Sequence, residues 1–440
     1  MAESVIAYLL GLGTGFVEYW VQGWMDVQAL TWAQFVRTFW WLLVFDLPRY
    51  ILPDIVLLIY LTVQGLFHWP KKMEIDYDFL PTVSVLVPAH NERESAAKTV
   101  RSLLEQDYPI SEIIVVDDGS MDGTYESVLR FSTDPRVKVI RNDVRGGKAS
   151  ALQTALSMSS GEILVSCDSD STFDRDAVRW LVQYFKDPRV GAVSGNIKVR
   201  NRNATLATWM QAAEYEIAIS VGRRVNASMD FLTVVSGAFG AYRREDIVAT
   251  GGWDPGIGDD SNATLKVRKR KKRIAFAWQA ICLTDAPERW RILWRQRRRW
   301  DKSGYRNRVR KHPGLLNPFI YSWSSTIAIL LALFYRIVLL FLFLFWFFYD
   351  LLWLHRGNLA WIIMVTFAVY AVANFISLVV AWMTSPRGDE WKLFWTAPFL
   401  MFHHWFLRGP RALSTFEEIF GLNYRQRFYP DHVWEQAPKW

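Results

Sequence analysis

Two aspartates separated by one residue follow a short apolar run near the middle of the chain. In "CDSDSTF", Asp168 and Asp170 flank Ser169, directly after the apolar residues 163–167. Carboxylates with this spacing at the end of a strand can share a hard divalent cation, and Mg²⁺ is usually held by few carboxylates together with substrate phosphates. A surface turn with two solvated aspartates is the alternative interpretation. The buried character of the preceding run favours a site for Mg²⁺ or Mn²⁺.

A lysine after two glycines is a second candidate. "RGGKAS" places Gly146 and Gly147 directly before Lys148, where a helical pattern begins. The segment is not a P-loop, because the upstream glycine and the Ser or Thr after the lysine are missing. A lysine at a helix start can still contact a phosphate group.

The stretch "RQRRRW", residues 295–300, combines arginines with a tryptophan. If residues 288–306 form a helix, Gln296, Arg299 and Trp300 lie at positions i, i+3 and i+4, hence on one face. That face presents an amide, a guanidinium for a phosphate oxygen and an indole on which a sugar ring can stack. Arg297 and Arg298 point elsewhere, where we expect them to meet lipid headgroups.

The elements that must position these residues begin near Thr82. Short apolar runs alternate with amphipathic ones, which predicts an α/β domain with a parallel sheet. Ligands of such sheets bind beyond the carboxyl ends of the strands. Taken alone, "DDGS" at 117–120 is also a common turn sequence. The candidate ligand-site residues at the first two strand ends are Pro88, Ala89, Asn91, Glu92, Asp117 and Asp118.

Composition indicates that part of the chain lies in a membrane. The chain has 440 residues, of which 51% are hydrophobic and 15% aromatic, a rich content for a soluble protein. Runs long enough to span a bilayer of roughly 30 Å are predicted at 5–24, about 51–68, 319–349 and about 359–382. The shorter run 391–407 contains Pro398 and is left open between an interfacial, a re-entrant and a spanning segment.

The basic residues fit a membrane protein better than a nucleic-acid-binding one. The net charge is +8, and Lys and Arg gather on the flanks of the polar domain, which places that domain on the cytoplasmic side. We expect no nucleic-acid partner. Arg336 lies within a predicted span and needs either an internal ion pair or a watery path for a polar substrate.

Seven motifs in order resemble a known family. They are "VPAHNE", "VVDDGSMDGT", "GGKASAL", "CDSD", "VSGAFGAYRRE", "GDDSNAT" and "QRRRW". They are individually weak and jointly specific, and they cover residues 82–310. The chain resembles processive membrane glycosyltransferases of family 2, such as hyaluronan, poly-N-acetylglucosamine, nodulation chitin-oligosaccharide and cellulose synthases.

The resemblance implies a GT-A (Rossmann-like) domain that binds a UDP-sugar. Uridine is then held near Asp118 and Glu92, and the diphosphate near Lys148 and a metal ion on Asp168 and Asp170. Chemistry divides the labour in the same way, because negative charge develops on the departing UDP and requires cations there. The attacking alcohol must lose a proton to a carboxylate on the opposite side of the sugar.

In the family pattern that base is Asp260 in "GIGDDSNAT", and Asp259 stands where a glutamate is frequent. A single displacement inverts the anomeric centre, so an α-linked UDP-sugar gives a β-linked polymer. Ser236 and Gly237 resemble the loop near the acceptor sugar, which Trp300 also contacts. Small residues at these two positions are equally typical of a tight turn.

The expected layout is N-terminal transmembrane helices (1–70), a GT-A domain (78–288), an interfacial region with the QRRRW motif (289–316), C-terminal transmembrane or interfacial helices (317–410) and a cytoplasmic tail (411–440). We expect a multi-pass cell-membrane protein that polymerises a UDP-activated amino sugar, UDP-N-acetylglucosamine being favoured. Its partners are the growing polysaccharide, the bilayer and, as a candidate, a small membrane subunit. With about thirty residues after the last apolar run, no fused cyclic-dinucleotide sensor domain is expected.

Three alternatives stay open for the reaction. A hyaluronan synthase would use UDP-N-acetylglucosamine with UDP-glucuronate, and a cellulose-like glucan synthase would use UDP-glucose. A non-processive enzyme would charge a polyprenyl phosphate, but such enzymes usually lack the Q-x-x-R-W element. A non-enzymatic scaffold would have lost some of the acidic motif residues, and none is lost here.

Overall fold

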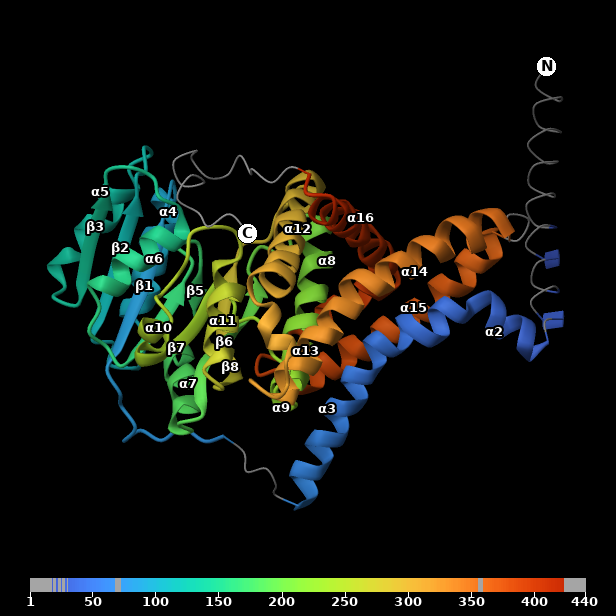
Figure 1. Ribbon diagram of the computed structural model, residues 1–440, viewed down its shortest axis with the longest axis horizontal. Helices are drawn as coiled ribbons and strands as arrows, with labels where there is room; N and C mark the ends of the chain where they lie inside the picture. Colours follow the sequence, from blue (N-terminus) through green and yellow to red (C-terminus); the bar gives the residue numbers. More distant parts are fainter. Residues whose placement is uncertain are drawn as a thin grey trace.

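The computed structural model describes residues 31–67, 73–354 and 359–422, together with six residues between 18 and 29. An α/β domain and a group of long helices lie side by side in it (Figure 1). Most of the predicted span 5–24 and most of the predicted tail 411–440 lie outside the described residues.

One eight-stranded sheet forms the centre of the α/β domain, with the strand order β3-β2-β1-β4-β7-β6-β8-β5. β1, β2 and β4 are rich in Val, Ile and Leu, and every residue of these three strands and of β6 is buried. Such continuous apolar runs are typical of strands that are covered on both faces. The strands are β1 (Val83–Ala89), β2 (Glu112–Asp118), β3 (Val137–Asn142), β4 (Ile163–Cys167), β5 (Thr172–Phe173), β6 (Val190–Val199), β7 (Phe239–Arg243) and β8 (Arg273–Thr284).

The prediction of a parallel sheet is correct for the β3-β2-β1-β4 half of this sheet, whereas the other half is mixed, with β6 and β8 paired in parallel. β1 pairs in parallel with β2 and β4, and β2 with β3. β7 is antiparallel to both of its neighbours, β4 and β6, and β5 is antiparallel to β8. Because β7 is reversed, its first residue, Phe239, lies opposite Cys167 at the end of β4. The loop before β7 and the loop after β4 therefore share one edge of the sheet.

Helices cover both faces of the sheet (Figure 1). Alternate residues of its strands belong to two separate apolar clusters. Cys167 and Cys282 are both buried and free. The helices of this domain are α4 (Arg93–Leu104), α5 (Thr124–Leu129), η2 (Arg130–Thr133), α6 (Lys148–Ser157), α7 (Ala177–Gln183), η3 (Tyr184–Lys186), α8 (Leu206–Tyr215), η4 (Glu216–Val221), α9 (Gly222–Ser228), α10 (Arg244–Ala249) and α11 (Asp259–Lys269).

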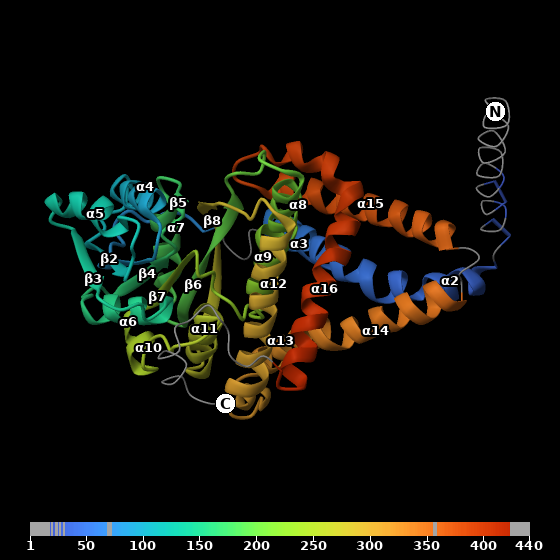
Figure 2. The same ribbon diagram turned by 90° about the horizontal axis from the view of Figure 1, so that it is seen from above.

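The QRRRW stretch is helical, as predicted. It lies in α12 (Trp290–Tyr305), which continues into η5 (Arg306–Lys311) and η6 (Pro313–Leu316). α12 stands between the sheet domain and the long helices (Figure 2). Its position makes it the boundary element between the polar and the apolar parts of the chain.

Two helices of the described residues are long and apolar enough to cross a membrane. They are the 31-residue helix Trp323–Trp353 and the 26-residue helix Leu359–Thr384, and they correspond to the spans predicted at 319–349 and about 359–382. Phe348 and Val372 are each 62% exposed, as expected for side chains that meet lipid. The first helix is built from α13 (Trp323–Leu333), η7 (Phe334–Val338), α14 (Leu339–Phe345) and η8 (Trp346–Leu354), and the second is α15.

The multi-span arrangement is not confirmed beyond these two helices. The span predicted at about 51–68 is helical, but α3 (Leu47–Phe67) is not one of the two described helices that are long and apolar enough to cross a membrane. It follows α2 (Trp32–Trp41) and η1 (Leu42–Asp46). α3 packs along α15, where the Asp54 carboxylate accepts a hydrogen bond from Ser377, and Trp41 of α2 contacts Phe343 of α14.

The last apolar run docks on the α/β domain. It forms η10 (Glu390–Phe399) and then α16 (Leu400–Ile419), which continues past residue 410. α16 lies against α12 in both views (Figures 1 and 2). Buried Glu417 and Glu418 of α16 pair with Lys302 and Arg306 of the α12 region. These contacts place α16 on the helix that carries the QRRRW motif.

Arg336 lies within the first apolar helix, and its ion-pair partner belongs to α12. Its Nη1 lies 2.7 Å from Oδ1 of Asp301 in α12. Arg411 of α16 lies 3.4 Å from the same oxygen. One carboxylate therefore joins the apolar helix, α12 and α16.

We predict that Asp301→Asn lowers the apparent unfolding temperature in detergent by several degrees, more than Arg336→Met does. The first change leaves two guanidinium groups without their shared anion, whereas the second leaves Asp301 paired with Arg411, and removal of one partner from a buried pair is the costly case. Thermal unfolding followed by circular dichroism measures the difference. An equal loss in both variants would contradict the shared role of Asp301.

Candidate active site

The carboxyl end of β2 supports the glycine loop before α6. The Asp118 carboxylate accepts hydrogen bonds from the backbone N–H groups of Gly146 (2.9 Å) and Gly147 (2.6 Å) and from the Asn142 amide (3.1 Å). Gly147 has a φ of 86°, which favours glycine. Asp118 thus fixes the loop that delivers Lys148 to the start of α6.

Asp117 is the neighbouring carboxylate, and it lacks such partners. Both of its oxygens are buried without a hydrogen bond to a described residue. The nearest cationic atom is Nε of Arg141, 3.6 Å away. A buried carboxylate without hydrogen bonds is costly, so Asp117 is well suited to accept a hydrogen bond from a ligand.

The loop after β1 carries Asn91 and Glu92 to the rim of a cavity of about 470 Å³. Lys98, Arg200 and Asp285 also line this cavity. Pro88 and Ala89 lie within β1, where Ala89 pairs with Asp117 of β2. Of the candidate ligand-site residues, Pro88 and Ala89 are therefore the two that form the end of the strand.

Lys148 lies at the centre of the candidate site. Its ammonium forms an ion pair with Asp168 and donates a hydrogen bond to the carbonyl of Gly237 (3.2 Å). It also lies 3.9 Å from Oδ2 of Asp259. The structure therefore brings together residues that are up to 111 positions apart in the sequence.

The Asp170 carboxylate is held close to other negative groups. Burial raises the pKa of Asp170 to about 6, and the charges of Asp168 and Glu92 add to this effect. The backbone between the two aspartates is fixed, because Thr99 donates a hydrogen bond to the carbonyl of Ser169 (2.8 Å). Ser169 thus supports the loop through its backbone.

Asp168 and Asp170 fit the expected cation only together with a ligand. No group of three or more His, Cys, Asp and Glu side chains that could hold a metal ion occurs in the described parts of the chain. Two carboxylates leave most positions of an octahedral Mg²⁺ or Mn²⁺ ion to water and phosphate oxygens, which is the usual arrangement for substrate-bound Mg²⁺. Burial first, and the converging negative charge second, raise the pKa of Asp170, and a bound cation would offset both effects.

Asp259 and Asp260 begin α11, after a loop that the α12 region holds in place. Gly258 has a φ of 74°, and a Cβ atom there would lie 2.5 Å from Cβ of Ser303 in α12. Asn307 donates a hydrogen bond to the carbonyl of Gly258 (2.9 Å). Only glycine allows this close approach, so α12 fixes the position of both aspartates.

The Asp260 carboxyl has a pKa closer to neutral pH than an ordinary aspartate. Burial raises its pKa to about 6 and the charge of Asp259 adds to this, while Lys148 acts in the opposite direction. The backbone N–H of Ser261 donates to its Oδ1 (2.6 Å). A half-buried carboxylate with this pKa can accept a proton at physiological pH.

The predicted acceptor loop meets Lys148 and Asp260. A Cβ atom at Gly237 would lie 3.0 Å from Nζ of Lys148 and 3.5 Å from Cβ of Asp260. The backbone N–H of Ser236 donates to Oγ of Ser194 (3.2 Å), which also accepts from Arg223 (3.0 Å). Because Gly237 has no side chain, it leaves space beside Lys148 and Asp260.

The predicted face of α12 is accessible at one end and buried at the other. Trp300 is 39% exposed, and Arg299 is exposed and makes no ion pair with a described residue. Oε1 of Gln296 is buried without a hydrogen-bond partner among the described residues. Trp300 also stacks under the guanidinium of Arg297, with 4.4 Å between Cζ and the ring centre.

The expectation that Arg297 and Arg298 meet lipid headgroups is wrong. Arg297 makes two hydrogen bonds, of 2.9 and 2.8 Å, to Glu214 of α8. Arg298 pairs with Glu417 of α16, with 3.1 Å between Nε and Oε2. Both guanidinium groups find buried carboxylates inside the protein, which replace the headgroup phosphates that we expected.

Sequence reasoning missed three residues that support the site. Arg223 lies near Asp260. Burial lowers the pKa of Arg223, and the charge of Asp260 acts in the opposite direction. Glu214 accepts hydrogen bonds from Arg297 and from His403 (2.9 Å). Asn307 holds the Gly258 loop. These side chains lie in runs without a motif, so the sequence carries no signal for them.

Residues 84–249 match the model of the family described as Glycosyl transferase family 2. The chain is 30% identical over 248 residues to the poly-beta-1,6-N-acetyl-D-glucosamine synthase of Staphylococcus aureus (strain COL), which covers 56% of this chain and 60% of that protein. The synthase of the same name from Staphylococcus epidermidis is 31% identical over 245 residues, or 55% of this chain and 57% of that protein. This chain thus matches about 60% of the length of these relatives.

A solved structure shows the same fold at low identity. The mannosyltransferase PcManGT from Pyrobaculum calidifontis, in complex with GDP-Man and Mn²⁺, superposes with a TM-score of 0.57 over 85% of this chain and 96% of that chain, at 20% identity. This likeness shows a GT-A-like fold. The match to the model of glycosyl transferase family 2 covers β2, β4, Lys148 and the Asp168–Asp170 pair.

Proposed function

We propose that this chain is an inverting, processive polysaccharide synthase of the cell membrane. It polymerises N-acetylglucosamine from UDP-N-acetylglucosamine into a β-linked chain and passes that chain across the membrane. The observation that supports it best is the convergence of Lys148, Asp168 and Asp259–Asp260 around Gly237. A cation, a cation-binding carboxylate and a buried base within one small volume are the groups that sugar transfer from a diphosphate requires.

The donor would lie along the carboxyl ends of β1, β2 and β4. Asp117, whose buried carboxylate accepts no hydrogen bond from the part of the chain that the structure describes, would accept one from the uracil ring. Lys148 would move from Asp168 toward the diphosphate when a divalent cation, Mg²⁺ or Mn²⁺, occupies the carboxylates of Asp168 and Asp170. That cation would supply positive charge for the departing UDP.

Asp260 would act as the general base. Its carboxylate would take the proton of the acceptor hydroxyl as that oxygen attacks the anomeric carbon from the face opposite to UDP. The space beside Gly237 leaves room for the acceptor sugar. Trp300 and the unpaired amide oxygen of Gln296 would stack on and orient the sugars, and Arg299 would contact a phosphate oxygen.

The two apolar helices and the docked α12 support membrane placement, with the α/β domain on the cytoplasmic side. The similarity to the two staphylococcal poly-beta-1,6-N-acetyl-D-glucosamine synthases supports an amino-sugar donor. A small membrane subunit would be a further partner. The growing polysaccharide would leave the site next to α12, the element that joins the site to the apolar helices.

We predict that Asp260→Asn removes at least about 99% of polymer synthesis while UDP binding is kept, because general-base catalysis supplies at least ~10²-fold. In the wild type, burial raises the pKa of Asp260 to about 6. Since only the ionised carboxylate accepts a proton, kcat/KM should fall as the pH decreases through about 6 and be constant above it. Initial rates of UDP release against pH measure this limb.

Glu245→Gln is the matched control, because Glu245 is an exposed carboxylate on α10 with a side chain 68% exposed. It should leave both the rate and the pH profile unchanged. More than about a tenth of the wild-type rate in Asp260→Asn would reject Asp260 as the base.

Metal dependence should depend on the Asp168–Asp170 pair. EDTA should stop turnover of the wild type, and added Mn²⁺ or Mg²⁺ should restore it, because the departing diphosphate needs a hard cation. Asp170→Ala should stay inactive at every metal concentration tested. Full activity in the chelator would contradict the assignment.

The donor prediction tests the proposed function directly. Purified protein in detergent with Mn²⁺ should release UDP from UDP-N-acetylglucosamine alone and form a β-linked homopolymer, detected by mass spectrometry after enzymatic digestion. A site that hydrogen-bonds the N-acetyl group should reject UDP-glucose strongly, because the unpaired polar groups of the site carry the penalty. A requirement for UDP-glucuronate would indicate hyaluronan, and turnover of UDP-glucose alone would refute the amino-sugar donor.

A further inference from the structure

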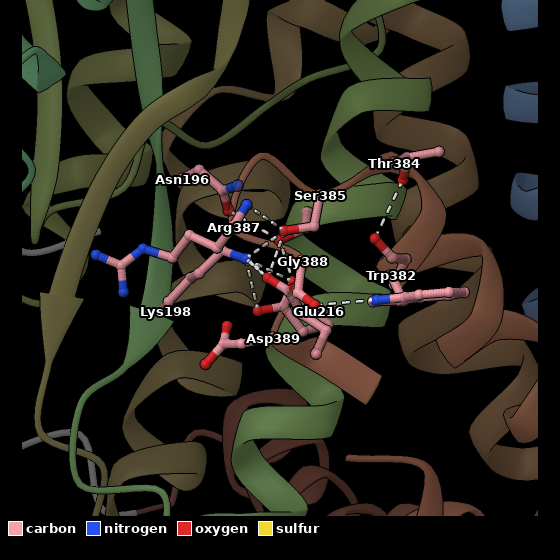
Figure 3. A network of polar contacts seen from close by, with 12 residues as sticks. Asn196, Lys198, Glu216, Trp382, Thr384, Ser385, Arg387, Gly388 and Asp389 are labelled. Atoms are coloured by element: carbon pink, nitrogen blue, oxygen red, sulfur yellow. Dashed lines mark hydrogen bonds and ion pairs between the residues drawn. The ribbon is translucent and has the colours of Figure 1, made fainter. Parts of the chain in front are cut away.

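A turn after the second apolar helix lies against the end of β6. Residues 385–390, called the α15 turn below, connect α15 to η10 (Figure 3). Nε1 of Trp382 donates a hydrogen bond to the carbonyl of Gly388 (3.0 Å), which fixes the turn on the end of α15. The α15 turn therefore follows the position of this apolar helix.

A buried charge cluster anchors the turn to β6. Lys198 of β6 pairs with Glu390 of the turn and lies 3.2 Å from Oε1 of Glu216 in η4. Lys198, Glu216 and Glu390 are 5%, 4% and 1% exposed. Lys198 also donates to Oγ of Ser385 (3.0 Å) (Figure 3). Loss of one partner from such a buried group is strongly unfavourable, so the turn and β6 must stay together.

Two further ion pairs lie outside this cluster. Arg202, in the loop after β6, donates to Asp389 of the turn (2.6 Å). Arg387 of the turn pairs with Asp174, with 3.3 Å between Nε and Oδ2. Asp174 directly follows β5, and β5 begins two residues after Asp170.

The loop after β6 also holds the other end of the same segment. Arg200 donates to the backbone carbonyl of Asp170 (3.0 Å) and to Oγ1 of Thr172 (3.2 Å). Its Nε donates to Asp285 (3.0 Å). Residues 170–174 are therefore held by Arg200 at one end and by Arg387 at the other.

We propose that the α15 turn positions the cation-binding segment 168–174. Arg387 acts on it through Asp174, and Arg202 acts on it by holding the turn against the loop that carries Arg200. Both are positioning residues, and they make the geometry of Asp168 and Asp170 depend on where α15 lies. A displacement of this helix, such as passage of a polymer would require, then changes cation binding at the donor site. This inference rests on the proposed function, which assigns the cation to Asp168 and Asp170.

The test measures Mn²⁺ binding, not turnover. Full-length protein in detergent is titrated with Mn²⁺ in the presence of UDP, and free Mn²⁺ is followed by electron paramagnetic resonance. Arg387→Gln and Arg202→Gln should each raise the Kd for Mn²⁺ about 10-fold, as the loss of outer contacts around a metal site typically does. Their unfolding temperatures should stay close to that of the wild type, because both ion pairs are partly exposed.

A charge exchange separates positioning from general damage. Arg387→Asp combined with Asp174→Arg restores the ion pair in reverse and should return the Kd to within about 2-fold of the wild type, since contacting residues couple. Arg189→Gln is the control, because Arg189 forms an equivalent exposed pair with Asp187 before β6. It should leave the Kd unchanged.

The failure of this inference differs from the failure of the proposed function. If the wild type binds Mn²⁺ with UDP and Asp170→Ala does not, the cation site stands. Unchanged Kd values in the folded Arg387→Gln and Arg202→Gln variants would then overturn the positioning role alone. If the wild type itself binds no Mn²⁺ in the presence of UDP, the cation site of the proposed function fails, and this inference fails with it.

Discussion

The ammonium group of Lys148 allows the acidic residues of this site to lie close together. Asp168 comes from the end of β4, and Asp259 and Asp260 begin α11, so three carboxylates meet where the dielectric is low and repulsion is strong. Lys148 pairs with Asp168 and lies 3.9 Å from Asp259. The geometry of the loops around it follows from this charge balance. The Gly237 carbonyl accepts a hydrogen bond from the ammonium, and a side chain at this position would crowd the ammonium group.

Asp170 and Asp260 are not among the carboxylates that lie within 4 Å of the Lys148 ammonium in the described residues. Burial raises the pKa of both Asp170 and Asp260 to about 6, and a neighbouring aspartate adds to each. In the proposed function, Asp170 would bind a cation and Asp260 would accept a proton near neutral pH. Two aspartates with similar pKa values would then serve different chemistry, because Asp170 lies after a strand end beside Asp168 and Asp260 lies at a helix start beside Gly237.

The site is also tied to the apolar helices at several points. The α12 region holds the Gly258 loop through Asn307 and Ser303, and it is itself held by Glu214 of α8 and Glu417 of α16. Asp301 links the same helix to Arg336 of the first apolar helix. Arginine side chains that would anchor an isolated helix to lipid headgroups here form ion pairs that join α12 to α8 and α16. The α/β domain and the apolar helices consequently form one connected structure in which α12 is shared.

The sequence determined the elements and the chemistry that they carry. Apolar runs predicted β1, β2, β3 and β4, the spacing of Asp168 and Asp170 predicted a cation pair at a strand end, and helical spacing placed Gln296, Arg299 and Trp300 on one face. These predictions depend on neighbours within a few residues, and local periodicity contains that information. Two of the predicted spans appear as long apolar helices for the same reason, because composition alone fixes them.

Only the tertiary structure decided which distant groups meet. The direction of β7 is not encoded in its five residues, yet its reversal brings Ser236 and Gly237 to the edge where Asp168 lies. The partners of Arg297 and Arg298, Glu214 and Glu417, are 83 and 119 residues away, and Lys198 and Glu390 are separated by 192. An isolated arginine or lysine looks the same in a sequence whether it meets water, lipid or a buried carboxylate. The choice among them is made by burial, because a charge removed from water requires an opposite charge wherever the packed chain brings one.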